Sequence, residues 1–140
     1  MFDLPIKSIM EQKKFLTAPP ESTVSHAARL MAKKNAGAVM VVEDGKLLGI
    51  FTERDAVFRV IALGRDPDTT PLSAVMTTEP KTIDSSKSYG HALLLMQDNG
   101  FRHVPVLENG QPIGVISSRN PMDPDLEEFV AEERRREHYR

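Results

Sequence analysis

The segment 49–55, with the sequence GIFTERD, combines three side chains that could hold one small ligand. Thr52 and Asp55 are three residues apart, and at a strand-to-helix turn a hydroxyl and a carboxylate at this spacing can converge on the same group. A carboxylate is a good acceptor for the two hydroxyls of a ribose. Arg54 lies between them, and a guanidinium group matches the oxygens of a phosphate. These residue types indicate binding of a phosphorylated sugar.

A second segment, GVISSRN at 114–120, places Ser117, Arg119 and Asn120 at the same spacing. The amide of Asn120 replaces the carboxylate and loses charge-assisted acceptance. Pro121 also biases Asn120 away from helical backbone angles, so the turn geometry is expected to differ. We therefore expect two unequal clefts, of which the Asp55 cleft is the stronger candidate.

Thr52 and Asp55 also fit a capping box, in which a Thr N-cap and an acidic N3 residue satisfy backbone amides without any ligand. For a single such pair, the cap is the favoured interpretation. Duplication favours a ligand-binding role, because a cap alone requires neither Gly49 and Gly114 nor the arginine that both segments keep. We expect at least one cleft to bind a ligand, and the two roles can coexist.

Both segments belong to an internal repeat with an offset of about 65 residues. Segment 27–31, AARLM, lies over segment 92–96, ALLLM, and the register continues without a gap. Two copies of this length suggest two half-modules packed face to face around a pseudo-two-fold axis, with clefts where they meet. We place the first repeat with an N-terminal segment at 1–66, the second repeat at 67–121, and a C-terminal helical tail at 122–140.

Each repeat is predicted to contain a helix, a β-hairpin, a second helix and a short third strand, which is an α+β arrangement with a small mixed sheet. The expected elements of the first repeat are a strand at 15–17, a helix at 24–31 capped by Ser22 or Ser25, a hairpin turning at Asp44-Gly45, and a helix at 55–63 that stops at Gly64. Those of the second are a strand at 81–83, a helix at 89–96 and a hairpin turning at Asn109-Gly110.

The composition argues against several kinds of site. The chain has 140 residues, a formal net charge of −2, 40% hydrophobic residues and no cysteine, so it has no disulfide, no cysteine-ligated zinc and no cysteine nucleophile. The balanced charge argues against nucleic-acid binding, and acidic residues interleave with the run Arg134–Arg136. No histidine pair has metal-ligand spacing, and no apolar run is long enough to span a membrane. We expect no metal site, no membrane association and a cytoplasmic location.

The paired unit resembles a tandem CBS-domain pair, the Bateman module. The resemblance covers residues 6–120 and rests on GIFTERD and GVISSRN, which match the family pattern Gly-x-x-Ser/Thr-x-x-Asp/Asn. It implies an adenosine-binding function, in which Thr52 and Asp55 hold ribose in one cleft and Ser117 and Asn120 hold it in the other. It also implies that isolated modules pair into a flat homodimer of four repeats.

The resemblance adds further contact residues. Segment 102–105, Arg-His-Val-Pro, is similar to a family strand entry in which the basic pair reaches phosphate and the apolar residue contacts the base. Its first-repeat counterpart, 37–40, has lost the basic pair but keeps an apolar residue. The family places a short strand with adenine-contacting backbone near Thr17 and Thr77. The ligand-binding residues so implied are Thr17, Val39, Thr52, Arg54, Asp55, Thr77, Arg102, His103, Val104, Pro105, Ser117, Arg119 and Asn120.

We interpret the chain as a regulatory, energy-sensing module and not as an enzyme. The repeated residues offer hydroxyls, one carboxylate and arginines, but no nucleophile with a base and no carboxylate pair. The expected ligand is AMP or another adenosine compound such as ATP, NADH or S-adenosylmethionine, and no catalytic cofactor is expected. The alternative is a structural dimerisation module with degenerate clefts, which acts through its C-terminal helix on a partner protein.

Overall fold

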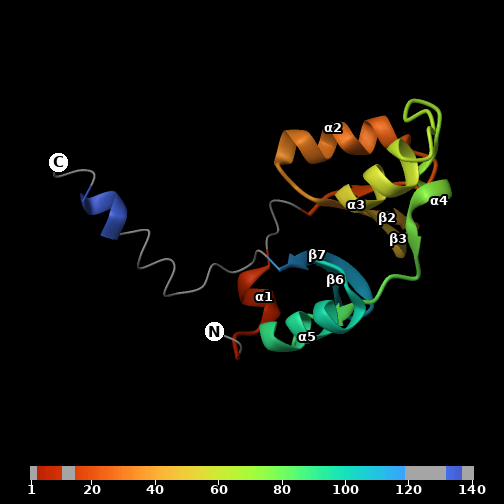
Figure 1. Ribbon diagram of the computed structural model, residues 1–140. Helices are drawn as coiled ribbons and strands as arrows, with labels where there is room; N and C mark the ends of the chain where they lie inside the picture. The colour runs from red at the N-terminus through yellow and green to blue at the C-terminus, as the bar shows by residue number, and fades with distance from the viewer. Residues whose placement is uncertain (1–2, 11–14, 119–131, 137–140) are drawn as a thin grey trace.

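The computed structural model describes residues 3–10, 15–118 and 132–136, and it shows two α+β halves stacked on each other (Figure 1). The sheet of the first half has the strand order β1-β2-β3-β4, and that of the second half has the order β5-β6-β7. The main helices, α2 and α5, lie on the outer faces of the stack. The predicted α+β fold with two packed repeats is confirmed.

The first half is formed by residues 15–78. Its strands are β1 (Thr17–Ala18), β2 (Ala38–Glu43), β3 (Lys46–Thr52) and β4 (Thr77–Thr78). Its helices are α2 (Val24–Lys34), α3 (Glu53–Asp55), the π-helix η2 (Ala56–Ile61) and α4 (Leu72–Val75). The second half contains β5 (Ile83–Asp84), α5 (Tyr89–Asn99), β6 (His103–Glu108), β7 (Gln111–Ser117) and the N-terminal helix α1 (Ile6–Ile9).

Both hairpins turn where the sequence predicts. Asp44 and Gly45 have φ angles of 52° and 76°, and Asn109 and Gly110 have φ angles of 53° and 78°. Positive φ at both central residues is the requirement of the type I′ turn, which Asp-Gly and Asn-Gly meet at low cost. The predicted third strands are also present, since β1 pairs in parallel with β2 and β5 pairs in parallel with β6.

The N-cap of α2 differs from the prediction. Thr23, and neither Ser22 nor Ser25, has the extended backbone of an N-cap, and its Oγ1 accepts a hydrogen bond of 3.1 Å from the His26 amide. A Thr side chain fills this role as a serine would. The helix therefore starts at Val24, and only the identity of the cap was wrong.

The predicted helix 55–63 is not a regular α-helix. The amide of Ala62 donates to the carbonyl of Val57, five residues back. This spacing gives η2 its π geometry, which is rare and is enriched near functional sites. The stretch still ends as expected, because Gly64 has a φ of 67°.

Residues 3–10 lie against the second half, although they adjoin the first repeat in the sequence (Figure 1). Ile6 and Met10 are buried in the core of the second half. Lys7 Nζ donates a hydrogen bond of 2.7 Å to Glu108 Oε1 on β6. This bond lowers the pKa of the Glu108 carboxyl below its ordinary value. The N-terminal segment thus completes the second half.

The segment 71–78 makes the equivalent contacts with the first half. Leu72 and Val75 of α4 are buried in the first core, and the Leu72 amide donates to the Ser22 carbonyl at 2.8 Å. β4, which follows α4, pairs antiparallel with β3. Each half therefore includes the short helix that opens the other repeat in the sequence.

The two sheets pack on each other through an apolar layer of Ala38, Met40, Ile50 and Val115. Side chains alternate along β2, so Ala38 and Met40 enter this layer while Val39 enters the first core. Both faces of the strand are covered, which explains why its first four residues are all buried. The layer brings β3 and β7 into contact, with Ile50 and Val115 in it.

In the part of the chain that the structure describes, no helix is long and apolar enough to cross a membrane. Of the predicted C-terminal tail at 122–140, the described residues are 132–136, and these are helical.

Gly49 and Gly114 lie where a methionine from the opposite repeat covers the sheet. A Cβ atom on Gly49 would stand 2.6 Å from Met76 Sδ and 2.7 Å from the Thr77 carbonyl oxygen. A Cβ atom on Gly114 would stand 2.8 Å from Met10 Sδ. Packing between the repeats therefore explains both glycines. The two glycines are therefore not evidence for a ligand.

We expect Gly49→Ala to lower the free energy of unfolding by about 1–3 kcal/mol, because the added methyl group must displace a backbone oxygen as well as a side chain. Gly114→Ala meets only the flexible Met10 side chain and should cost less. Urea unfolding of the two variants measures the difference. Equal costs would contradict the assignment of Thr77 as the rigid contact.

Candidate functional site

A cleft of about 740 Å³ opens where the two halves meet. The first half contributes the end of β3, α3 and η2, and the second half contributes the start of β6 and the end of β7. The residues predicted from the sequence that line it are Thr52, Arg54, Asp55, Thr77, Arg102, His103 and Ser117. The fold thus brings the hydroxyl and carboxylate of one repeat to the basic residues of the other.

Four predicted residues lie elsewhere in the described chain. Val39 and Val104 have fully buried side chains in the first and second cores. Along their strands they point away from the layer between the two sheets. Pro105 is also fully buried, on β6 opposite Val115 of β7. Thr17 is exposed on β1, which by its parallel pairing corresponds to β5 and not to β4. Thr17 is therefore not the counterpart of Thr77.

The second predicted cleft is only partly described. Ser117, which was expected to hold ribose there, lines the same cleft as Thr52. Arg119 and Asn120 lie outside the described residues.

Thr52 and Asp55 form the capping box that their spacing predicts. Asp55 Oδ2 accepts hydrogen bonds from the Thr52 amide at 2.9 Å and from Thr52 Oγ1 at 3.1 Å. The Asp55 amide in turn lies 3.3 Å from Thr52 Oγ1. The cap fixes the carboxylate at the point where β3 turns into α3, inside the cleft.

The other oxygen of Asp55 makes longer contacts. Asp55 Oδ1 lies 3.4 Å from Thr77 Oγ1 and 3.5 Å from Arg59 Nε. Because these contacts are longer than a usual charge-assisted hydrogen bond, Oδ1 is the oxygen that a ligand hydroxyl could reach at least cost. The Asp55 side chain is 8% exposed, so such a hydroxyl would be largely shielded from water.

Arg54 stacks on an aromatic ring at the edge of the cleft. Its guanidinium carbon lies 4.7 Å from the centroid of Phe58, which also lines the cleft. A cation over an aromatic face is favourable, and the stacking leaves the edge of the planar guanidinium able to donate to an anion.

His103 of the second half faces Glu53 of the first half across Gly37. A Cβ atom on Gly37 would collide with Glu53 Oε1 and would stand 2.8 Å from His103 Nε2. Position 37 corresponds to Arg102 in the second repeat. Close packing of an acid and an imidazole from opposite halves therefore explains why the first repeat has no side chain here.

Tyr89 supports the end of β7 from the second core. Its hydroxyl lies 3.4 Å from the Ser117 carbonyl oxygen and 3.5 Å from that of Ser118. Burial raises the pKa of the Tyr89 hydroxyl above its ordinary value, so it remains a neutral donor. Tyr89 thus supports, from the core side, the wall of the cleft that Ser117 and Ser118 form.

Several cleft residues were missed from the sequence. The cleft also contains Glu53, Phe58, Arg59, Glu79, Lys81 and Phe101. Arg59 could have been found, because it is four residues after Asp55 on a predicted helix. Lys81 and Phe101 come from loops of the other repeat, and their positions depend on how the halves pack.

The cleft is nearly balanced in charge. Four permanently cationic side chains, Arg54, Arg59, Lys81 and Arg102, lie with three carboxylates, Glu53, Asp55 and Glu79. Among the described residues, no group of three or more His, Asp or Glu side chains could hold a metal ion. The chemistry available is hydrogen bonding to hydroxyls and ion pairing with a small anion.

We expect Asp55→Ala to lower the free energy of unfolding by about 1–3 kcal/mol, since it removes the capping box together with a half-exposed ion pair. Thr52→Ser keeps the capping hydroxyl and is the control, with an expected change below about 0.5 kcal/mol. Chemical denaturation measures both. An Asp55→Ala protein as stable as Thr52→Ser would show that the cap contributes nothing.

Comparison with known proteins identifies the repeat. The sequence profile of the CBS domain matches residues 6–62 and 72–122. The CBS domain-containing protein YhcV of Bacillus subtilis (strain 168) is 38% identical over 101 residues, which is 72% of this chain and 71% of YhcV. CBSCBSPB3 of Arabidopsis thaliana, also a CBS domain-containing protein, is 41% identical over 104 residues. That match covers 74% of this chain and 19% of the plant protein, so the chain spans about a fifth of its length.

The fold agrees with this match. The CBS domain protein PAE2072 from Pyrobaculum aerophilum, solved in complex with AMP, superposes with a TM-score of 0.78. The superposition covers 92% of this chain and 99% of PAE2072 at 22% sequence identity. With two profile matches over most of its length and the stacked halves described above, the chain belongs to the CBS domain family and carries the domain twice.

Proposed function

We propose that the chain is a regulatory module that binds an adenosine nucleotide, with AMP as the first candidate, in the cleft between its halves. The observation that carries this proposal is that Thr52 and Asp55 of one repeat share a cleft with Arg102, His103 and Ser117 of the other. Its volume of about 740 Å³ lies within the range of small-molecule sites.

In this proposal each part of the nucleotide meets a side chain of matching chemistry. The ribose hydroxyls donate to Asp55 Oδ1, which the capping box leaves available. The phosphate binds the guanidinium groups of Arg54 and Arg102. The adenine packs against apolar lining such as Ile50 and Phe101.

The charge of the cleft favours a monophosphate. Four cationic side chains are offset by three carboxylates, so the net positive charge available to a ligand is small. A phosphate monoester carries about −1.5 to −2 at pH 7, and a triphosphate carries more. AMP is therefore a better match than ATP. The AMP complex of the structurally similar PAE2072 supports the same choice.

A regulatory role follows if the ligand binds one arrangement of the halves more tightly than another. The ligand shifts that equilibrium by as much free energy as it distinguishes between the two states. The cleft is built from both halves, so their relative placement affects every contact. We propose a regulatory role and not a catalytic one, since the Thr52 hydroxyl and the Asp55 carboxylate are engaged with each other in the capping box.

A second candidate function is structural dimerisation, and a surface of η2 favours it. Val57, Phe58, Ile61 and Leu63 are 50%, 58%, 72% and 64% exposed. Large apolar side chains grouped in this way mark interaction surfaces more often than isolated ones do. We propose that a second copy of the chain covers this surface, to form a homodimer. Dimerisation is compatible with nucleotide binding, and it becomes the main function if the cleft binds no nucleotide.

We expect Arg54→Ala to weaken binding of AMP about tenfold and to leave binding of adenosine nearly unchanged, since only AMP has a phosphate for this residue. Arg29→Ala, an exposed arginine on α2 outside the cleft, is the matched control. Isothermal titration with AMP, ATP and adenosine measures the affinities. Equal losses for AMP and adenosine would remove Arg54 from the phosphate site. Affinities weaker than about 1 mM for every nucleotide would favour the dimerisation function.

We expect Ile61→Asp to convert the homodimer to a monomer, because a carboxylate in an apolar interface is desolvated without a partner. Ala28→Asp, at an exposed position of α2, controls for the addition of one negative charge. Sedimentation velocity gives the mass of each variant. If Ile61→Asp keeps the mass of the unmodified protein, the η2 surface is not the interface.

A further inference from the structure

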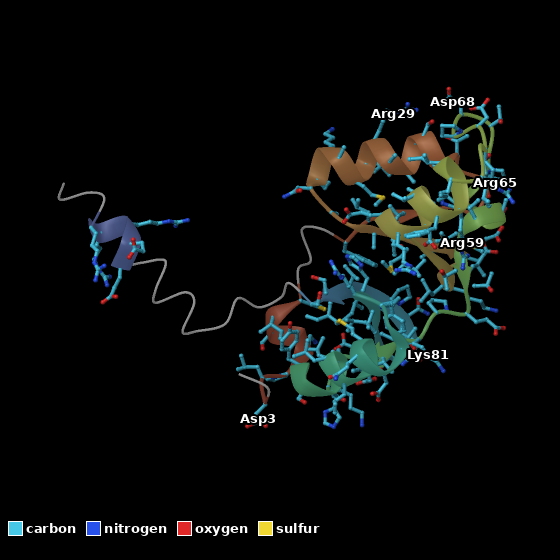
Figure 2. The ribbon with its side chains drawn as sticks, in the orientation of Figure 1. Asp3, Arg29, Arg59, Arg65, Asp68 and Lys81 are labelled. Carbon is cyan, nitrogen blue, oxygen red and sulfur yellow. The ribbon has the colours of Figure 1, made fainter. Side chains whose placement is uncertain are left out.

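The Arg59 side chain links the cleft to the α4–β4 segment. Its Nε lies 3.5 Å from Asp55 Oδ1. Its Nη1 donates to the Met76 carbonyl at 2.9 Å and lies 3.4 Å from the Val75 carbonyl. Figure 2 shows Arg59 beside the green α4–β4 segment, on the same side of the molecule as Lys81. One guanidinium group thus contacts both the cleft carboxylate and the end of α4.

The end of α4 needs such a contact. α4 has four residues, so its last carbonyls have no partner within the helix. An arginine from another element can satisfy these carbonyls, as basic side chains do at helix C-termini. Directly after them, Met76 covers Gly49, and Thr77 pairs with Ile50 of β3. Arg59 therefore helps to seat the segment that joins the first half to the second.

The contact with Asp55 is the weaker end of this link. Asp55 Oδ2 is bound by Thr52 at 2.9 and 3.1 Å, while the Oδ1 contacts with Arg59 and Thr77 are 3.5 and 3.4 Å. A hydroxyl that donates to Oδ1 would compete with Arg59 and Thr77 and would leave the capping box in place. The Arg59 side chain is 49% exposed, so it has room to shift.

We propose that Arg59 is a positioning residue that couples occupancy of the cleft to the seating of the α4–β4 segment. This inference rests on the proposed function, because the ligand that competes for Asp55 Oδ1 is a nucleotide ribose. When a ribose hydroxyl donates to Asp55 Oδ1, the Arg59 guanidinium group loses its contact with Asp55. Its hydrogen bonds to the Val75 and Met76 carbonyls then change. The effect reaches β4 and the loop after it, through which the halves are connected.

An arginine is required for this role. Its planar group presents donors in fixed directions, so Nε and Nη1 can serve a carboxylate and a carbonyl at the same time. A lysine has one compact ammonium group, which can bind either partner but cannot span both.

Hydrogen exchange of the whole chain tests the link, first without ligand. The probes are the Met76 amide, which donates to Leu72, and the amides of β4. Arg59→Gln should speed their exchange about tenfold, because the segment opens locally more often. Arg59→Lys should give a smaller increase. Arg65→Gln, an exposed arginine in the loop after η2, is the control and should change nothing. Unchanged exchange in Arg59→Gln would overturn the link.

The second arm repeats the measurement with saturating AMP. In the unmodified protein, AMP should change exchange at Met76 and β4, and it should bind Arg59→Gln more tightly, up to about tenfold, because Asp55 Oδ1 no longer has to be freed from Arg59. In Arg59→Gln, at AMP concentrations that saturate it, exchange at these amides should not respond. A merely structural role would weaken binding but keep the response, and that result would overturn the coupling. If AMP does not bind the unmodified protein, the proposed function fails and the coupling fails with it. The ligand-free arm then still decides whether Arg59 seats the segment, and Arg59→Lys serves if Arg59→Gln does not fold.

Discussion

The packing of two sheets on one shared apolar layer is the constraint on which the cleft depends. Met40, Ile50 and Val115 fill this layer, so β3 and β7 meet along it. Thr52 and Ser117, which end these strands, consequently line the same cleft. Neither repeat alone would carry a complete site, because one provides the carboxylate and the other provides Arg102 and His103. The α1 and α4 segments cross between the repeats and reinforce this arrangement.

Asp55 shows how a capping residue can also serve a ligand. A carboxylate offers about four lone-pair sites, and the capping box uses only those of Oδ2. The remaining oxygen faces Thr77 and Arg59 at longer distances. The structural and functional interpretations of the Thr52–Asp55 pair therefore do not exclude each other. The cap fixes the orientation of the carboxylate before any ligand arrives, which reduces the entropy that binding must overcome.

Local signals predicted the repeat, the hairpins and the third strands, because Asp44-Gly45 and the apolar periodicities act within a few residues. Three features were beyond the reach of these local signals for one physical reason, which is that tertiary contacts decide them. Val39 lies in a strand buried on both faces, so no polar alternation shows which face meets the other half. Thr17 was matched to Thr77 by its distance from the start of the repeat, whereas strand pairing matches β1 to β5. The role of Arg59 depends on the position of α4, which its own repeat does not determine.

The difference between Gly37 and Arg102 breaks the pseudo-two-fold symmetry at the cleft. A perfect duplication would place equivalent basic residues at both strand entries and allow a nucleotide to bind in either direction. In the first half, a side chain at position 37 would collide with Glu53 and crowd His103, so the basic strand entry, Arg102 and His103, has no counterpart at positions 37 and 38. The acidic ribose acceptor, Asp55, belongs to the first half. A nucleotide bound as proposed therefore has one orientation, with its sugar at Asp55 and its phosphate between Arg54 and Arg102, and the lack of a side chain at position 37 contributes to that direction.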